Sequence, residues 1–236
     1  MANSLTKHIP NALTSCNLMS GCVAIVFALS ANYSMALTFI VVGAVFDFFD
    51  GMSARLLGVS SPIGKELDSL ADVVTFGVAP SMMIYTILLT IDKTGYNDIL
   101  AAAAPYVAFV MAAFSAIRLA KFNLDERQTT SFIGLPTPAN ALFWGALIVG
   151  SEEYLALSSG SIYILLIMVF VSSWLLVAEI PMFALKFKHW GWRENKIKYV
   201  FLVSCLPLLL IFGITGISVI IAWYICLSVI TSKKNA

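Results

Sequence analysis

Four aspartates stand in a region whose flanks are almost entirely apolar. Asp47 and Asp50 are three residues apart, and Asp68 and Asp72 are four apart, in the stretch DFFDGMSARLLGVSSPIGKELDSLAD. If both segments are helical, each pair lies on one helical face, and the short GVSSPIG turn would let the two pairs face each other. An aspartate costs roughly 2.5 to 3.5 kcal/mol at the centre of a membrane. One such residue is often explained by pairing with an arginine, but four at this spacing favour a functional site.

A cluster of four carboxylates repels itself unless cations neutralise it. Ligands that are all oxygen favour hard divalent ions, so we expect two Mg²⁺ or Mn²⁺ ions, with Ca²⁺ as a substitute. Two such ions can clamp a phosphoryl group during transfer. Gly51 and Ala54 are small enough to let a ligand approach the helix, and Arg55 offers a planar fork that suits phosphate. Small residues alone also occur where membrane helices pack against each other.

The elements that hold these residues are predicted to be membrane helices. The chain has 236 residues, of which 60% are hydrophobic and only 11% are charged, and this composition excludes an ordinary soluble domain. Polar residues, Gly and Pro divide it into an all-α, polytopic membrane helix bundle with about eight transmembrane helices and a short N-terminal interfacial segment. The predicted helices span residues 11–29, 35–57, 65–91, 99–121, 137–157, 161–179, 199–212 and 216–230.

The distribution of positive charge predicts the orientation of this bundle. With eight spans, every Lys and Arg except Lys93 falls on the same side, which the positive-inside rule makes the cytoplasmic side. Both termini and the aspartates should therefore be cytoplasmic, where a nucleotide can reach them. A miscount by one helix would destroy this asymmetry, because each later loop would change sides.

We expect a single membrane-embedded domain over residues 1–236. Within it, residues 1–10 form the interfacial segment, residues 11–182 the catalytic core, and residues 197–232 a C-terminal helical hairpin that is peripheral to the site. The four cysteines lie inside apolar runs without metal-binding or redox spacing, so we interpret them as packing residues.

The eight residues of the motif match in every position the signature of the CDP-alcohol phosphotransferases, a family that the chain therefore resembles. They are Asp47, Asp50, Gly51, Ala54, Arg55, Gly64, Asp68 and Asp72. The resemblance implies a six-helix core, here followed by the hairpin, and a homodimer. It implies that Asp47, Asp50 and Asp68 hold one metal ion. The second ion would be held by Asp47, Asp68 and Asp72, with Asp72 also acting as general base. The residues that would bind CDP-diacylglycerol are Asn11, Thr14, Asp50, Gly51, Ala54, Arg55, Ser61 and Gly64.

Two further segments resemble the phosphatidylserine synthase branch of that family. They are IPNALTSCNLMSG at 9–21 and RLAKFNLDERQTTSFIGLPTPANA at 118–141. This resemblance implies transfer of a phosphatidyl group from CDP-diacylglycerol to L-serine, giving phosphatidylserine and CMP. A serine pocket needs a cation for the carboxylate, so Arg118, Lys121 and Asn123 are candidates. Ordinary positive-inside anchoring is the alternative explanation for Arg118 and Lys121.

Two other functions stay open at this point. The acceptor could be another alcohol, such as glycerol 3-phosphate or an inositol phosphate, although a phosphate dianion should demand a denser Arg/Lys cluster. The four carboxylates could also be the ion site of a divalent-cation transporter, which would place them near mid-membrane on broken helices. The expected partners are CDP-diacylglycerol, L-serine, membrane lipids and a second copy of the chain, and no nucleic acid.

Overall fold

The computed structural model describes residues 8–59, 61–92, 96–125, 132–158, 160–183 and 191–235. Nearly all of them are helical, and two short strands, β1 (Phe132–Ile133) and β2 (Pro181–Met182), pair in antiparallel fashion. The predicted all-α bundle is thereby confirmed. Most of the predicted interfacial segment, residues 1–7, lies outside the described residues, as do Lys7, Lys93, Arg127, Lys186 and Lys188 of the charge pattern.

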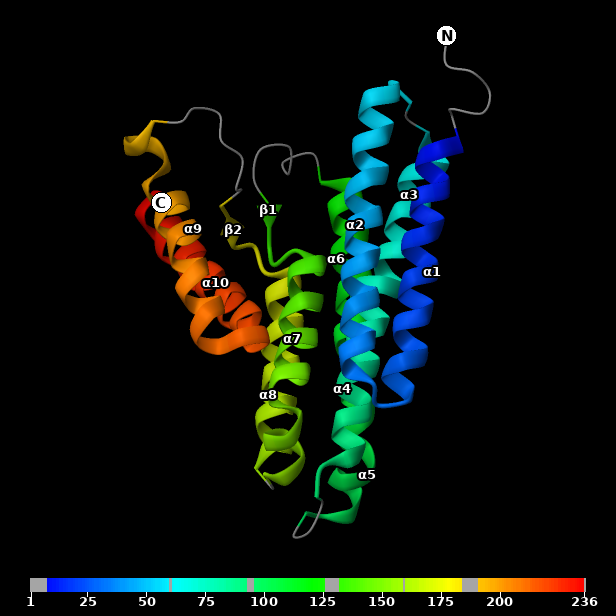
Figure 1. Cartoon of the computed structure of the whole chain (residues 1–236), viewed down its shortest axis with the longest axis vertical. Coiled ribbons are helices and arrows are strands. Elements are labelled where there is room, and N and C mark those ends of the chain that lie inside the picture. Colours follow the sequence, from blue (N-terminus) through cyan, green and yellow to red (C-terminus); the bar gives the residue numbers. More distant parts are fainter. Residues whose placement is uncertain are drawn as a thin grey trace.

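Eight helical rods follow one another along the described chain. The first six are α1 (Ile9–Leu29), α2 (Tyr33–Leu57), a continuous helix made of α3 (Pro62–Asp72), the π-helical η2 (Val73–Val78) and α4 (Ala79–Thr90), then α5 (Asp98–Val107) with α6 (Phe109–Leu124), α7 (Thr137–Leu157) and α8 (Ser161–Val177). The last two are α9 (Trp192–Phe212) and α10 (Gly216–Asn235), joined by the 3₁₀ turn η4 (Gly213–Thr215). Figure 1 shows these rods arranged along one long axis, with the start of α1 and the end of α10 in the upper part of the view.

Five stretches of the described chain are long and apolar enough to cross a membrane. They cover residues 9–29, 33–57, 62–90, 98–124 and 195–231, and α8 is a shorter apolar helix. The last stretch contains both α9 and α10, whose chain turns at Gly213. Large apolar side chains cover the outer surface, including Leu210, Ile211 and Val203 on α9. Such a surface suits lipid rather than water, so the protein is an integral membrane helix bundle, while the number of eight spans stays a prediction.

The helices near the aspartates pack around α1. This helix packs against both α2 and the α3–η2–α4 helix, and α2 contacts the latter through its η2 and α4 parts. Thr75 of η2 lies at the crossing, where its Oγ1 donates a 3.0 Å hydrogen bond to the carbonyl oxygen of Asn17. Gly21 and Gly43 make this approach feasible, because a Cβ on either glycine would collide with Thr75. The sequence predicted one regular helix here and missed the π-helical segment that follows Asp72.

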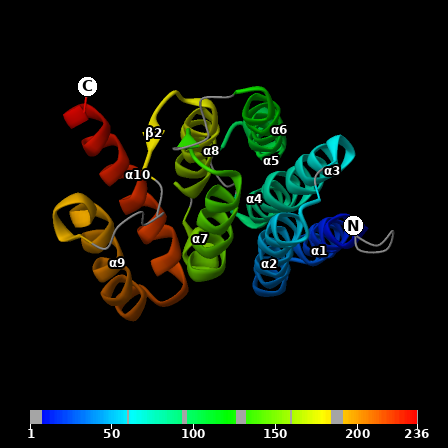
Figure 2. The same cartoon turned by 90° about the horizontal axis from the view of Figure 1, so that it is seen from above.

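The C-terminal hairpin packs on α7. Ser218 donates a 2.7 Å hydrogen bond to the carbonyl oxygen of Phe143, and a Cβ on Gly150 would collide with Thr215. Seen from above in Figure 2, α9 and α10 lie on one side of the molecule and α1 to α3 on the other, with α7 and α8 between them. The hairpin therefore supports the bundle at a distance from the aspartates.

Candidate active site

Three of the four aspartates, two from the C-terminal half of α2 and one from α3, come together in space. One carboxylate oxygen from each of Asp47, Asp50 and Asp68 lies within 4.8 Å of the other two. Asp50 is buried, and Oδ1 of Asp68 is a buried acceptor without a hydrogen-bond partner. Carboxylates held this close repel each other strongly away from water, and an acceptor left unpaired costs further free energy. The donor set is all oxygen and carries several negative charges, so the residues fit a divalent metal ion.

Asp72 lies one helical turn beyond Asp68 and is held separately. Its side chain is buried, and its Oδ1 accepts a 3.0 Å hydrogen bond from Nδ2 of Asn17 on α1. It is close enough to Asp47 and Asp68 for direct electrostatic interaction. The predicted cluster of four therefore consists of three carboxylates that are close enough to share one metal ion and a fourth, Asp72, which lies beside them and is oriented by the amide of Asn17.

A polar face of helix α1 contacts both the cluster of three carboxylates and Asp72. Thr14 donates a 2.6 Å hydrogen bond from Oγ1 to Oδ2 of Asp50, and Asn17 reaches Asp72 as described. Asn17 was missed in the sequence analysis. The signal was present, because Asn11, Thr14 and Asn17 repeat every three residues and so share one face of an otherwise apolar helix.

A cleft of about 190 Å³ opens beside these carboxylates, and we call it the α1–α3 cleft. It is lined by Asn11, Thr14, Asp50, Gly51, Ala54, Val59, Ser61, Gly64, Lys65 and Asp68. All the residues predicted to bind CDP-diacylglycerol line it except Arg55. The Arg55 guanidinium nevertheless lies 3.6 Å from the point that a Cβ on Gly51 would occupy. Val59 and Lys65 are lining residues that the sequence analysis missed.

The start of α3 gives this cleft a positive wall. Ser61 caps the helix by accepting a 3.0 Å hydrogen bond from the backbone N–H of Gly64. A Cβ on Gly64 would stand 3.0 Å from Ser61 Oγ and 3.1 Å from Asn11 Oδ1, so glycine keeps this approach open. The N–H groups of Gly64 and Lys65 are bonded to Ser61 and Pro62 has none, so the positive character of this wall comes from the dipole of α3 and from the charge of Lys65. The wall is therefore suited to phosphate groups.

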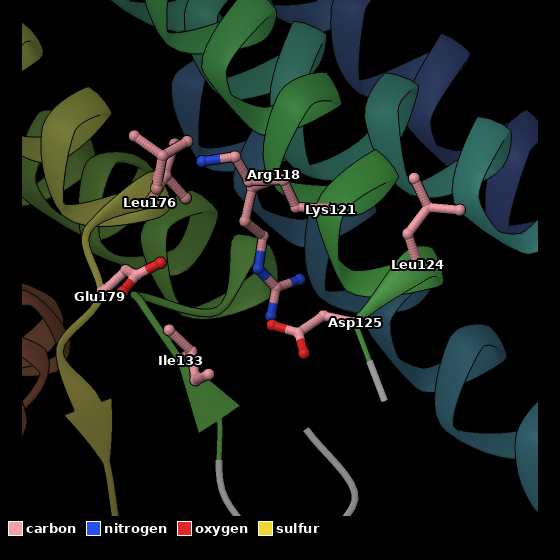
Figure 3. Close-up of a pocket in the computed structure, with 8 residues that line it drawn as sticks. Arg118, Lys121, Leu124, Asp125, Ile133, Leu176 and Glu179 are labelled. Atoms are coloured by element: carbon pink, nitrogen blue, oxygen red, sulfur yellow. The ribbon is translucent and has the colours of Figure 1, made fainter. Parts of the chain in front are cut away.

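A second space of about 390 Å³, the α6–α8 pocket, lies between the ends of α6 and α8 and strand β1 (Figure 3). It is lined by Arg118, Lys121, Leu124, Asp125, Ile133, Leu176, Val177 and Glu179. Two of the three predicted serine-binding residues, Arg118 and Lys121, face it. Asn123 instead lies toward α3, where its side-chain amide donates a 2.9 Å hydrogen bond to Ser69 Oγ and its backbone carbonyl oxygen accepts a 2.8 Å hydrogen bond from Lys65 Nζ.

Arg118 is a buried cation rather than a surface anchor. Only 7% of its surface is exposed, and its Nη1 donates a 3.3 Å hydrogen bond to Thr137 Oγ1. Its guanidinium lies over the ring of Phe122, 5.3 Å from the centroid, and its Nε has no hydrogen-bond partner. It is also close enough to Asp72 for electrostatic interaction. Positive-inside anchoring explains an exposed residue such as Lys121, but not an arginine buried next to the carboxylates.

Comparison with known proteins identifies the family. Residues 7–230 match the CDP-alcohol phosphatidyltransferase family. The chain belongs to this family. The match covers nearly the whole chain and includes every residue of both spaces, so this CDP-alcohol phosphatidyltransferase is an enzyme that transfers a phosphoryl-linked group, as the aspartate signature predicted.

Several relatives of this phosphatidyltransferase carry the same name, CDP-diacylglycerol–serine O-phosphatidyltransferase. The protein from Helicobacter pylori strain 26695 is 33% identical over 233 residues, which cover 96% of this chain and 95% of the relative. The protein from Bacillus subtilis is 40% identical over 136 residues, covering 56% of this chain and 70% of the relative. The protein from Methanocaldococcus jannaschii is 34% identical over 161 residues, covering 68% and 70%.

Two acidic residues of the α6–α8 pocket were not among the predicted site residues of this phosphatidyltransferase. Asp125 follows the end of α6, and Glu179 lies between α8 and β2, 54 positions further along the chain. Figure 3 shows the Asp125 carboxylate and the Arg118 guanidinium pointing toward each other, with Glu179 on the opposite wall. Nothing local in the sequence pairs residue 179 with residue 118, because only the packing of α6 against α8 brings them together.

Proposed function

We propose that this protein transfers the phosphatidyl group of CDP-diacylglycerol to the hydroxyl group of L-serine, giving phosphatidylserine and CMP. The observation that carries the proposal is that the carboxylates are close to two different spaces: Asp50 and Asp68 line one, and Asp72 is near Arg118 of the other. One is a cleft lined by the signature residues with a positive wall for phosphates, and the other is a pocket with a buried arginine. The names of the relatives support serine as the acceptor.

Two divalent ions, Mg²⁺ or Mn²⁺, would be held by Asp47, Asp50, Asp68 and Asp72. The unpartnered Oδ1 of Asp68 and the close approach of three carboxylates support this assignment. When bound, such ions neutralise diphosphate charge and stabilise the oxygens of the leaving CMP. Ca²⁺ offers the same hard character and is a substitute that can occupy oxygen sites.

The α1–α3 cleft would bind CDP-diacylglycerol through this chain's own groups. Asn11 and Thr14 would border the nucleotide, while Ser61, Arg55 and the start of α3 would contact the diphosphate. Lys65 adds a cation that the signature does not include. The acyl chains would extend sideways into the bilayer, which explains why a site for a hydrophilic nucleotide is built on membrane helices.

Asp72 would act as the general base. It would take the proton of the serine hydroxyl while the serine oxygen bonds to the phosphorus of the phosphatidyl group, and the bond between that phosphorus and the CMP oxygen breaks with its electron pair leaving on CMP. Asn17 occupies Oδ1 of Asp72, so Oδ2 would be the oxygen that receives the proton. Arg118 would hold the serine carboxylate and so bring the hydroxyl toward Asp72.

The membrane orientation and assembly belong to the same proposal. Eight spans, with both termini and the site on the cytoplasmic side, follow from the distribution of Lys and Arg. The homodimer is inferred from the family resemblance. A cytoplasmic site gives direct access to soluble serine and releases CMP into the compartment where nucleotides are used.

The acceptor is tested with purified protein, CDP-diacylglycerol and Mn²⁺. CMP release is measured with L-serine, glycerol 3-phosphate and an inositol phosphate as acceptors, each over a range of concentrations. We expect release with L-serine and formation of phosphatidylserine, identified by mass spectrometry of the lipid. Release with a phosphate-bearing alcohol but not with L-serine would contradict the serine assignment and leave the phosphatidyl transfer intact.

A further inference from the structure

The α6–α8 pocket contains both signs of charge. Arg118 and Lys121 come from α6, and the carboxylates of Asp125 and Glu179 line the same space. An acceptor that carries phosphate offers only negative charge, and it would bring that charge next to both carboxylates. An amino acid offers an ammonium and a carboxylate on one carbon atom, so it needs an anion and a cation at close range. The charges of the pocket therefore match a zwitterion.

The backbone holds Glu179 in place from both sides. The N–H of Gly134 donates a 2.9 Å hydrogen bond to the carbonyl oxygen of Ile180, and the N–H of Leu135 donates one of the same length to Leu175. In β1 and β2, Ile133 pairs with Pro181. These contacts tie the segment between α8 and β2 to the segment that leads into α7, so the position of residue 179 is set by the fold.

The two carboxylates of the pocket occupy different positions. Figure 3 shows Asp125 on the side of α6, turned toward the Arg118 guanidinium, whereas Glu179 lies on the wall across the pocket from α6. Asp125 is thus placed to orient the arginine. Glu179 is placed to meet a positive group of a ligand whose negative group lies on Arg118.

We propose that Glu179 binds the ammonium group of the acceptor while Arg118 binds its carboxylate, so that the pocket selects a zwitterionic alcohol over an alcohol phosphate. This inference rests on the proposed function, whose acceptor site it describes. Arg118 supports a ligand site independently of the acidic residues, because it is 7% exposed, lines the pocket and has a buried Nε without a partner.

The test combines Glu179→Gln with acceptors that lack one charge. Gln keeps the size of the side chain and removes its charge. Turnover and competitive inhibition are measured with L-serine, with 3-hydroxypropionate, which lacks the ammonium, and with ethanolamine, which lacks the carboxylate. We expect kcat/KM for L-serine to fall about 10- to 100-fold, because a hydrogen bond between charged partners is lost. The binding of 3-hydroxypropionate, measured as turnover or inhibition, should change less than about threefold.

Two other variants make the result specific. Glu153→Gln makes the same chemical change at an exposed position of α7, 16 residues or about 24 Å along the helix from Thr137, and should leave both acceptors unaffected. Asp125→Asn should weaken the binding of L-serine and of 3-hydroxypropionate to the same extent, because Asp125 acts through Arg118. Mn²⁺-dependent binding of CDP-diacylglycerol shows that each variant is folded.

The outcomes separate the inference from the function. The ammonium assignment is wrong if Glu179→Gln leaves the kinetics with L-serine unchanged, or if it weakens the binding of 3-hydroxypropionate as much as that of L-serine. Serine transfer by the unsubstituted protein would stand in either case. If the unsubstituted protein transfers to glycerol 3-phosphate and not to L-serine, the proposed function itself is wrong.

Discussion

The α1–α3 cleft and the α6–α8 pocket are built in different ways. The cleft takes its residues from three consecutive helices, between Asn11 and Asp68, and half of them belong to the eight-residue motif. The pocket collects residues from 118 to 179, which meet only because α6 packs against α8 and β1 pairs with β2. On the proposed assignment, the donor site is thus encoded locally in the sequence, and the acceptor site depends on tertiary packing. Substitutions in the pocket should therefore change the kinetic constants for the acceptor without changing those for the donor.

The largest effect is expected at the carboxylates shared by both proposed metal ions. Asp68→Asn keeps the side-chain size and removes a charge from the group formed with Asp47 and Asp50. Losing metal stabilisation of several kcal/mol should lower kcat at least about 1,000-fold with every acceptor. Binding of Mn²⁺, followed by electron paramagnetic resonance, should weaken in parallel. Asp98→Asn, at an exposed position in the first turn of α5, is the control. Normal Mn²⁺ binding by Asp68→Asn would remove this residue from the metal site.

A comparable but smaller loss is expected for Asp72→Asn. Asparagine can still accept the hydrogen bond from Asn17 through Oδ1, so the helix geometry should persist while the base is lost. A general base contributes about 100- to 10,000-fold, and kcat should fall by that factor. Binding of CDP-diacylglycerol, measured by equilibrium dialysis, should change little. Turnover close to that of the unsubstituted protein would show that another group takes the proton.

The sequence predicted the cleft in detail because its spacing is helical. Pairs of aspartates three and four residues apart are local features that a helix converts directly into positions. The helix predicted from residue 65 begins three residues earlier, at Pro62, because Ser61 caps it. The prediction lacked Asn17, whose role depends on α1 packing beside Asp72, and it lacked the π-helical segment after Asp72. Both depend on how α1 and α2 approach Thr75, which is a contact between helices rather than a property of one helix.

The pocket was only half predicted, for a physical reason. Arg118 and Lys121 are three residues apart on α6, so their shared face could be inferred. Asn123 was expected beside them, but a helix turns by about 100° per residue and this position faces α3 instead. Glu179 could not be connected to them at all, because two strands of two residues each carry no pattern that single-sequence reasoning can detect.

The third prediction tests whether the cleft acts on the donor alone. Thr14→Val removes the hydroxyl that donates to Asp50 and keeps the side-chain shape. Loss of a hydrogen bond to a charged partner should lower kcat/KM for CDP-diacylglycerol about 10- to 100-fold. The KM for L-serine should stay within about twofold if the two spaces are independent. The matched control is Thr38→Val, where an exposed threonine bonds only to the backbone of its own helix. An equal change in both KM values would break the distinction between the two regions.

The smallest effect is expected at the wall of the pocket, and it should fall on the acceptor alone. Gly134 has φ +75°, which costs an alanine about 1 to 2 kcal/mol, and its Cβ would stand 2.6 Å from the carbonyl oxygen of Leu176. Because this collision is with a backbone atom at the end of α8, Gly134→Ala should shift the segment that carries Glu179. We expect the KM for L-serine to rise about 3- to 10-fold and the melting temperature to fall, with the KM for CDP-diacylglycerol unchanged. Gly160→Ala is the control, since its Cβ would meet no atom within 4 Å. A rise in both KM values for Gly134→Ala, with no change for Gly160→Ala, would mean that the pocket wall also positions the carboxylates. The cleft and the pocket would then not be independent of each other.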